Sequence, residues 1–523
     1  MTTARPPGLS RRGFLGALGA TLVPAISGPL ARPLYAATER GHGAPRIAIV
    51  GAGIAGLTAA RTLRDRGVAA TVYEAQLRVG GRMRSESALW GNGQVSEYCG
   101  ELIDTDHTLM QALAKRFSLP LTDVLAAVPE NAEQTIFQHG RYYPERRLFA
   151  DFRPVYRTLA AHVAAAGPAT TYAHSTPMGR ELDRMTLAQW IERFVPGGRK
   201  SDVGTFIYLQ YVAEYGIAAD RQSALNMVYW LGRQPHYDAR TGEFVALGPS
   251  DERFHIAGGN DRLPQAIAAS LPAESLRLGH RLEAIMRRSD GRIALSFLTA
   301  NGSITEVVDK AIVTVPFSVL RGIDTARAGF DALKRVAIAE LAYGDHSKLV
   351  VQFDERYWHG TGSWPGHSSG DITYDGAFQQ TWEATRGQRG TSGLIVDYAA
   401  AEQSAVMRPQ APHTTSTLAP TAGYAKTFVR ELERVWPGAE KHFTGKAALS
   451  HAVADPFARG SYAGWLAGQY SRFAGYERVR QGNVLFAGEH CSVLLQGFME
   501  GAAREGVRAA HEVLADAGRS AAA

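Results

Sequence analysis

The sequence predicts an α/β fold of two domains, one of them assembled from separate stretches of the chain. Its 523 residues are 45% hydrophobic and 20% charged, as expected for a globular protein with two or three folding units. Between residues 46 and 74, an apolar run, a glycine turn, a helical pattern and a second apolar run follow one another, which is typical of parallel strands joined by a helix. A strand, turn and helix pattern returns at residues 483–514. Because these stretches lie far apart, we expect one discontinuous sheet.

The first 36 residues have the pattern of an export signal. Arg11 and Arg12 precede an apolar stretch over 13–30, and alanines follow it near residue 36. The paired arginines predict a twin-arginine signal over 1–36, and hence a periplasmic or secreted protein. The alternative is an uncleaved membrane anchor, although glycines and a proline thin the apolar run. No later stretch reaches about 18 apolar residues, so we expect no membrane span after processing.

Charge and cysteine content argue against other classes of protein. The net charge is +6, but residues 1–36 contain four arginines and no acidic residue, so the rest of the chain is nearly neutral. A nearly neutral chain makes nucleic acid an unexpected partner. Two cysteines, Cys99 and Cys491, are too few for a disulfide framework or a cysteine zinc site, and whether they pair stays open. The histidines form no metal-binding pattern, so no metal is expected.

The first glycine turn predicts a dinucleotide site. It follows an apolar strand over 46–50 and contains Gly51, Gly53, Ala55 and Gly56. Gly51 allows the tight turn, Gly53 allows a pyrophosphate to approach the backbone, and Gly56 allows the helix and strand to pack closely. The second strand, over 70–73, ends at Glu74, where a carboxylate can accept hydrogen bonds from a ribose. The alternative is a glycine turn that binds no ligand, but it does not explain why Glu74 stands at the end of the second strand.

A second glycine turn, over residues 78–85, favours a flavin over a nicotinamide. It contains Gly80 and Gly81, with Arg78 and Arg82 beside them. Guanidinium groups near the pyrophosphate of the first turn would neutralise negative charge that the start of the helix alone does not balance. The alternative is a solvated basic turn.

At this point the sequence resembles the flavin-containing amine oxidase family, which includes monoamine oxidases, polyamine oxidases and L-amino-acid oxidases. Besides both glycine turns, the resemblance rests on residues 99–107, 258–264, 311–316, 485–490 and 497–502. It implies a Rossmann-like FAD-binding domain together with a mixed α+β substrate domain. The residues that it assigns to FAD, with those of the first turn, are Gly51, Gly53, Ala55, Gly56, Glu74, Gly81, Arg82, Gly100, Glu101, Leu102, Gly488, Glu489 and Met499. Ser461 stands where some monoamine oxidases carry a flavin-linking cysteine, so noncovalent FAD is expected.

The resemblance also divides the chain. We expect the FAD-binding domain to comprise 45–106, 257–345 and 456–516, and the substrate domain to comprise 107–256 and 346–455. The strand over 483–487 is expected beside an early strand of the same sheet. In the substrate domain, helices are expected over 187–194 and 202–215, and strands over 348–353 and 393–398.

Three residues are candidates for the chemistry. Lys348 begins an apolar strand, and its segment is similar to one in which the family holds a water against flavin N5 with a lysine. Tyr462 and Phe498 match the two aromatic rings that the family places before the flavin, and Trp465 is expected to line the same wall. A lysine exposed at a strand edge and rings that only fill a core are the plain alternatives.

One further motif is set aside. Residues 366–370 match the Gly-x-Ser-x-Gly turn of hydrolase nucleophiles, but no apolar strand precedes them and no helical pattern follows. We interpret this stretch as a flexible loop.

The sequence therefore predicts an exported FAD-dependent amine oxidase that transfers a hydride from the α carbon of an amine to flavin N5. The products are an imine or aldehyde and, with O2 as acceptor, hydrogen peroxide. Open alternatives are an L-amino-acid oxidase, an amine dehydrogenase that uses a periplasmic electron carrier, and a non-catalytic FAD-binding protein. The expected partner is a small amine or amino acid, and a homodimer is a candidate assembly.

Overall fold

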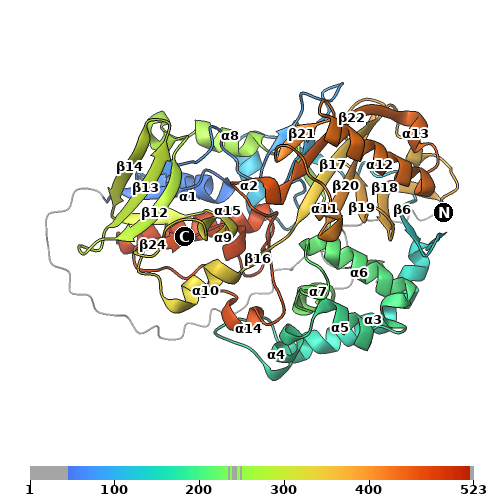
Figure 1. The fold of residues 1–523 in the computed structure, drawn as a ribbon, viewed down its shortest axis with the longest axis horizontal. Coiled ribbons are helices and arrows are strands. Elements are labelled where there is room, and N and C mark those ends of the chain that lie inside the picture. The colour runs from blue at the N-terminus through green and yellow to red at the C-terminus, as the bar shows by residue number, and fades with distance from the viewer. Residues whose placement is uncertain (1–44, 234–235, 238–243, 248–249, 519–523) are drawn as a thin grey trace.

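A computed structural model describes residues 45–233, 236–237, 244–247 and 250–518, which are organised around two large β-sheets (Figure 1). The predicted export signal over 1–36 lies outside the described residues. Among the helices of the described part, none is both long and apolar enough to cross a membrane.

The first sheet is parallel and has five strands. In spatial order these are β11 (Leu276–Arg277), β2 (Thr71–Tyr73), β1 (Ile47–Val50), β15 (Lys310–Val313) and β24 (Val484–Phe486). The expected strands near both ends of the chain therefore share one sheet. The expectation that they are neighbours is wrong, because β15 lies between them and pairs with both.

The two faces of this sheet are covered differently because side chains alternate along each strand. On one face, Ile49 packs in a core with α1 (Ile54–Asp65) and α15 (Met499–Asp516). On the other, Val50 packs with a three-stranded antiparallel sheet. Its strands are β12 (Arg281–Arg287), β13 (Ile293–Thr299) and β14 (Gly302–Val308). Gly506 lets α15 approach α1 closely, since a Cβ there would lie 2.1 Å from the Ala55 carbonyl oxygen.

The second sheet has eight strands and follows a different part of the chain. In spatial order they are β21 (His413–Thr415), β22 (Phe443–His451), β17 (His346–Phe353), β20 (Gly393–Ala400), β19 (Gln380–Glu383), β18 (His367–Tyr374), β6 (Ala132–Gln138) and β7 (Arg141–Tyr142). Helix α12 (Ala419–Val435) covers one face. The strands expected over 348–353 and 393–398 are confirmed as parts of β17 and β20.

The interpretation of residues 366–370 as a flexible loop is wrong. Ser368 and Ser369 are buried within β18, which pairs in parallel with β6. The Ser368 hydroxyl lies 3.3 Å from Thr135 Oγ1 and accepts a hydrogen bond from the Gly370 N–H at 3.1 Å. Polar side chains that bond within the sheet can fill a strand without any apolar pattern, and the sequence signal was therefore missing.

A layer of helices lies beside the eight-stranded sheet (Figure 1). It consists of α3 (Glu145–Ala166), α4 (Pro177–Arg184), α5 (Leu187–Phe194), α6 (Asp202–Tyr215) and α7 (Leu225–Leu231). The predicted helices over 187–194 and 202–215 are confirmed as α5 and α6. Trp190 and Phe206 are buried in the core of this layer.

The remaining elements are short. The paired strands are β3 (Ser85–Glu86) with β4 (Ser96–Glu97), β5 (Leu121–Asp123) with β10 (Phe254–Ile256), β8 (His236–Tyr237) with β9 (Phe244–Ala246), and β16 (Ala342–Tyr343) with β23 (Ala463–Gly464). The helices are α2 (Thr108–Arg116), α8 (Arg262–Ala269), α9 (Phe317–Leu320), α10 (Ala332–Glu340), α11 (Glu402–Ala405), α13 (Ala439–His442) and α14 (Tyr470–Phe473).

The five-stranded sheet draws its strands from 45–106, 257–345 and 456–516, and the eight-stranded sheet draws its strands from 107–256 and 346–455. The domain boundaries themselves stay a prediction.

Candidate active site

One cavity of about 850 Å³ extends from the glycine turn after β1 to Lys348 on β17. This volume is at the upper end of the usual range for ligand sites. The cavity lies at the carboxyl ends of β1, β2, β15 and β24, which is where open α/β sheets bind their ligands. It brings together nearly all the predicted site residues: Gly51, Gly53, Ala55, Glu74, Gly81, Arg82, Gly100, Glu101, Leu102, Lys348, Tyr462, Trp465, Gly488, Glu489, Phe498 and Met499. Gly56 is not among the lining residues.

The three glycines of the first turn have different surroundings. Gly51 has a φ of +106°, which favours glycine. A Cβ on Gly56 would lie 2.0 Å from the Gly51 carbonyl oxygen, so this glycine allows α1 to pack against the strand end. A Cβ on Gly53 would meet no protein atom within 4 Å, so it would project into the cavity. Gly53 is also the N-cap of α1 and provides no side-chain cap, so this helix end is left for a ligand.

Glu74 is buried at the end of β2. Its Oε2 accepts a hydrogen bond from the Ala52 N–H at 2.7 Å, and its Oε1 accepts one from the Gln76 N–H at 2.8 Å. Burial raises the pKa of this carboxyl, against the effect of these two backbone donors. The two bonds hold the carboxylate at the cavity wall, where each oxygen keeps a second lone pair for a ligand.

Arg82 and Glu489 connect the second glycine turn to the C-terminal segment. Arg82 Nη1 lies 2.9 Å from Glu489 Oε1 and also donates to the Ser461 carbonyl at 2.6 Å. Burial opposes the charge of Arg82, but the Glu489 carboxylate holds the pKa of Arg82 above its ordinary value. Glu489 Oε2 also accepts the Gly497 N–H at 3.0 Å. The pair therefore fixes three distant segments around the cavity.

Lys348 is buried in the centre of the eight-stranded sheet. Its strand β17 lies between β20 and β22, which excludes the alternative of an exposed lysine at a sheet edge. The Lys348 ammonium forms an ion pair with Glu101, and it lies 5.3 Å from the centroid of the Trp382 ring. Trp382 Nε1 donates to the other Glu101 oxygen at 3.1 Å. The sequence assigned Glu101 only to the cofactor, and the structure makes it the partner of Lys348.

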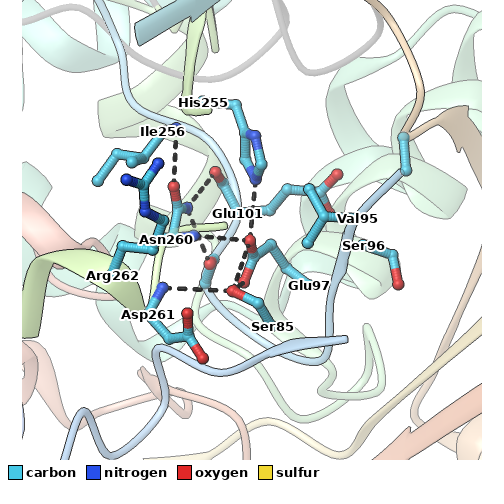
Figure 2. A network of polar contacts seen from close by, with 12 residues as sticks. Ser85, Val95, Ser96, Glu97, Glu101, His255, Ile256, Asn260, Asp261 and Arg262 are labelled. Carbon is cyan, nitrogen blue, oxygen red and sulfur yellow. Dashed lines mark hydrogen bonds and ion pairs between the residues drawn. The ribbon is translucent and has the colours of Figure 1, made fainter. Parts of the chain in front are cut away.

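A second network, drawn in Figure 2, holds the backbone of Glu101. Asn260 Nδ2 donates to the Glu101 carbonyl at 2.5 Å, and the Asn260 N–H donates to Glu97 Oε1 at 2.8 Å. His255 Nε2 lies 2.9 Å from the same Glu97 oxygen, and the Ser85 hydroxyl donates to Glu97. Glu97 is fully buried, and sequence reasoning missed it, although the motif of residues 258–264 that contains Asn260 was a signal.

The predicted aromatic residues line the same cavity. The Tyr462 hydroxyl donates to the Glu214 carbonyl and lies 3.3 Å from the Tyr398 hydroxyl. The His346 ring stacks on both, with its centroid 5.2 Å from the Tyr462 ring and 4.6 Å from the Tyr398 ring. Sequence reasoning missed Tyr398, because only the pairing of β17 with β20 places it opposite Lys348.

Phe498 is the N-cap of α15 and has aromatic neighbours on two sides. Its ring centroid lies 5.1 Å from that of His107 and 5.9 Å from that of Trp230. Trp465 is buried, and its ring lies 4.9 Å from that of Tyr470. The His107 ring beside Phe498 is neutral, because burial lowers the pKa of His107 to about 3. Trp230 was also missed, because the short helix α7 carries no recognised motif.

The cysteines and one cluster of possible metal ligands are further features of the described residues. Cys99 and Cys491 are both free, and burial raises the pKa of each thiol, which disfavours a reactive thiolate. Possible ligand atoms of Asp104, Asp106 and His107 lie within 4.8 Å of one another. However, Asp104 already accepts hydrogen bonds from the Ser250 hydroxyl and the Glu252 N–H, and its own N–H bonds to His107 Nδ1. The expected absence of a metal stays a prediction.

The chain is similar to flavin-dependent proteins in both sequence and structure. Residues 54–514 match the family described as flavin containing amine oxidoreductase. Over 480 residues the chain is 24% identical to YobN of Bacillus subtilis (strain 168), covering 89% of this chain and 94% of that protein. Over 519 residues it is 24% identical to the flavin-dependent L-tryptophan oxidase RebO of Lentzea aerocolonigenes, covering 92% and 100%. The solved structure of cyclohexylamine oxidase from Brevibacterium oxydans IH-35A is similar with a TM-score of 0.74 at 18% identity, covering 91% of this chain and 100% of that one. This likeness confirms the predicted two-domain α/β fold.

Proposed function

Because the chain belongs to the flavin containing amine oxidoreductase family, we propose that it binds FAD noncovalently and oxidises the carbon next to the nitrogen of a small amine. The substrate becomes an imine, which water hydrolyses to an aldehyde. The single observation that carries the proposal is the cavity that joins Gly53 to Lys348, Tyr462 and Phe498. When bound, FAD would supply the hydride acceptor at its N5 atom.

The residues at the parallel sheet fit a dinucleotide. The open space at Gly53 and the uncapped start of α1 suit a diphosphate, which needs close approach to backbone N–H groups. Arg82 adds a positive charge beside the same turn, and Glu74 offers its remaining lone pairs to ribose hydroxyls. We therefore assign the half of the cavity from Glu74 to Glu489 to FAD.

The other half has the features that amine oxidation requires. The rings of Tyr462 and Phe498 present apolar faces that exclude water and orient an amine. We propose that the Lys348 ammonium, held by Glu101, holds a water and donates a proton during oxygen reduction or imine hydrolysis.

Noncovalent attachment is supported by Ser461. Its hydroxyl lies 2.6 Å from His346 Nδ1 and donates to the Gly344 carbonyl at 3.1 Å. Because residue 461 is a serine, the cavity wall has no cysteine thiol at this position that could form a covalent bond with the flavin.

The cellular setting is part of the proposal. Arg11 and Arg12 support export by the twin-arginine route to the periplasm or beyond, which would carry the folded protein with its cofactor. O2 is the proposed electron acceptor, with hydrogen peroxide as its product. A homodimer is the proposed assembly, and light scattering on the purified protein tests it.

Oxidation of L-amino acids is the second candidate. It is favoured by the similarity to RebO, which is named an L-tryptophan oxidase. An α-carboxylate needs a cation beside the oxidised carbon. Two cations of the cavity are already paired, Lys348 with Glu101 and Arg82 with Glu489, and a third, Arg233, follows α7 rather than the segments that carry the two rings. We therefore place simple amines first.

The test is product analysis in air with one panel of primary and secondary amines and one of L-amino acids. We expect equimolar aldehyde and hydrogen peroxide from simple amines. Oxidation of amino acids alone would replace the proposal by the second candidate, and turnover only with an artificial electron carrier would make the protein a dehydrogenase. No oxidation of either panel by flavin-loaded protein would contradict the proposed function and leave a binding protein.

A further inference from the structure

Arg233 lies on the cavity wall just after α7. Its guanidinium carbon lies 4.4 Å from the centroid of the Tyr229 ring, and Nη2 donates to the Pro168 carbonyl. The Tyr229 hydroxyl is itself held at 2.8 Å from Thr170 Oγ1. The guanidinium is therefore anchored on one side by a ring and a carbonyl, and it borders the cavity on the other.

Arg233 has no acidic partner among the described residues, whereas two other buried or half-buried cations of the cavity do. Arg82 pairs with Glu489 and Lys348 pairs with Glu101. Burial lowers the pKa of Arg233, and the groups that oppose this effect are Tyr229 and Tyr470, not a carboxylate. A guanidinium in such a position lacks a counter-charge, and a carboxylate that fits its planar donors would supply one.

The position of Arg233 separates it from the reacting end of the cavity. The Tyr229 ring beneath it lies 6.3 Å from Tyr470, whose ring lies 4.9 Å from Trp465. Trp230 lies on α7, three residues before Arg233, and its ring is 5.9 Å from the Phe498 ring. Near the other end of α7, Asn226 Nδ2 donates to the Trp465 carbonyl at 3.0 Å, so Arg233 lies two helical turns, roughly 10 Å, from the part of the wall that carries Trp465.

We propose that Arg233 binds a carboxylate at the far end of the substrate, so that the preferred substrates are amines whose acidic group is several carbons away from the oxidised carbon. This inference rests on the proposed amine oxidation. An α-amino acid does not meet the geometry, because its carboxylate is bonded directly to the carbon that is oxidised. An ω-amino acid spans the distance, with its amine between the rings and its carboxylate on the guanidinium.

The test compares 6-aminohexanoate with 6-aminohexanamide, which has the same length without the charge. For the wild-type protein we expect kcat/KM to favour the acid by about 10- to 100-fold, the range for one charge-assisted hydrogen-bonded contact. Arg233→Met should bring this ratio close to one, and Arg233→Lys should restore part of it. Arg233→Glu should reverse the ratio, so that the amide is oxidised better than the acid. The same variant should favour 1,5-diaminopentane, whose second amine is positively charged.

Two controls separate this inference from a structural role and from the proposed function. Arg199 also stacks on a tyrosine, 3.3 Å from the Tyr208 centroid, but it does not line the cavity, so Arg199→Met should leave the ratio unchanged. Calorimetry with hexanoate, which cannot be oxidised, should give at least 10-fold weaker binding to Arg233→Met than to wild type.

A ratio near one in the wild type, or the same ratio and hexanoate affinity in wild type and Arg233→Met, would overturn the assignment. If no amine is oxidised at all, the proposed function fails, and the hexanoate measurement still decides the role of Arg233.

Discussion

At the scale of single residues, the ion pair between Lys348 and Glu101 places a charged hydrogen-bonding group at the wall of the cavity. Both side chains are buried, and their pairing offsets part of the cost of burying each charge. Lys348→Met should retain FAD, because Gly53, Glu74 and Arg82 keep their places and contacts in the cavity. The variant should slow amine oxidation or flavin reoxidation by about 100-fold, the scale of one positioned proton donor.

Stopped-flow measurement of the two half-reactions checks this prediction. Lys446→Met is the matched control, because Lys446 is an exposed lysine on the neighbouring strand β22. It should leave both rates unchanged. Wild-type rates in both half-reactions of Lys348→Met would show that the lysine has no catalytic role.

The glycines of the first turn give a paired prediction. Gly53→Ala should fold as stably as the wild type, since φ is −73° and a methyl group meets no protein atom within 4 Å, but it should bind FAD at least about 10-fold more weakly. Gly56→Ala should instead lower the free energy of unfolding by about 1–3 kcal/mol, because its methyl group overlaps the Gly51 carbonyl. FAD titration and denaturant unfolding of the FAD-free proteins distinguish the two. Equal FAD affinity of Gly53→Ala and wild type would show that this turn does not bind the diphosphate of FAD.

At the scale of elements, strand β20 carries a buried carboxyl into the contact between the eight-stranded sheet and α12. Asp397 lies on the same face of β20 as Ile395 and Ala399, which pack in that core, and its Oδ1 has no hydrogen-bond partner among the described residues. Burial raises the pKa of Asp397 from 3.8 to about 8. The folded protein therefore binds a proton that the unfolded chain releases across this range.

The consequence is a stability that falls as pH rises. Below pH 3.8 the carboxyl is neutral in both states, and between 3.8 and about 8 the contribution of Asp397 declines by up to ~1.4 kcal/mol per pH unit. Asp397→Asn keeps the shape without the titration, so it should flatten this slope. Unfolding free energies measured from pH 5 to 8 for both proteins provide the check, and an identical slope in the variant would contradict the assignment.

At the scale of the whole molecule, local motifs were predictable and long-range pairing was not. The turn from Gly51 to Gly56 and the acid Glu74 lie within one β-α-β unit, so spacing alone located them. The partner of Lys348 is 247 residues away, and the order in which β15 separates β1 from β24 leaves no trace in hydrophobic periodicity. Arg233 and Tyr398 were missed for the same reason, since only the folded cavity shows what they face.

The central claim is that a flavin bound beside Gly53 and Glu489 presents its reactive edge to the chamber of Lys348, Tyr462 and Phe498. The most direct measurement is the visible spectrum of the purified protein, recorded before and after anaerobic addition of an amine. We predict an oxidised flavin spectrum that bleaches on addition of the amine and returns when air is admitted. A protein that is colourless after incubation with FAD, or a bound flavin that no amine or amino acid bleaches, would contradict the account.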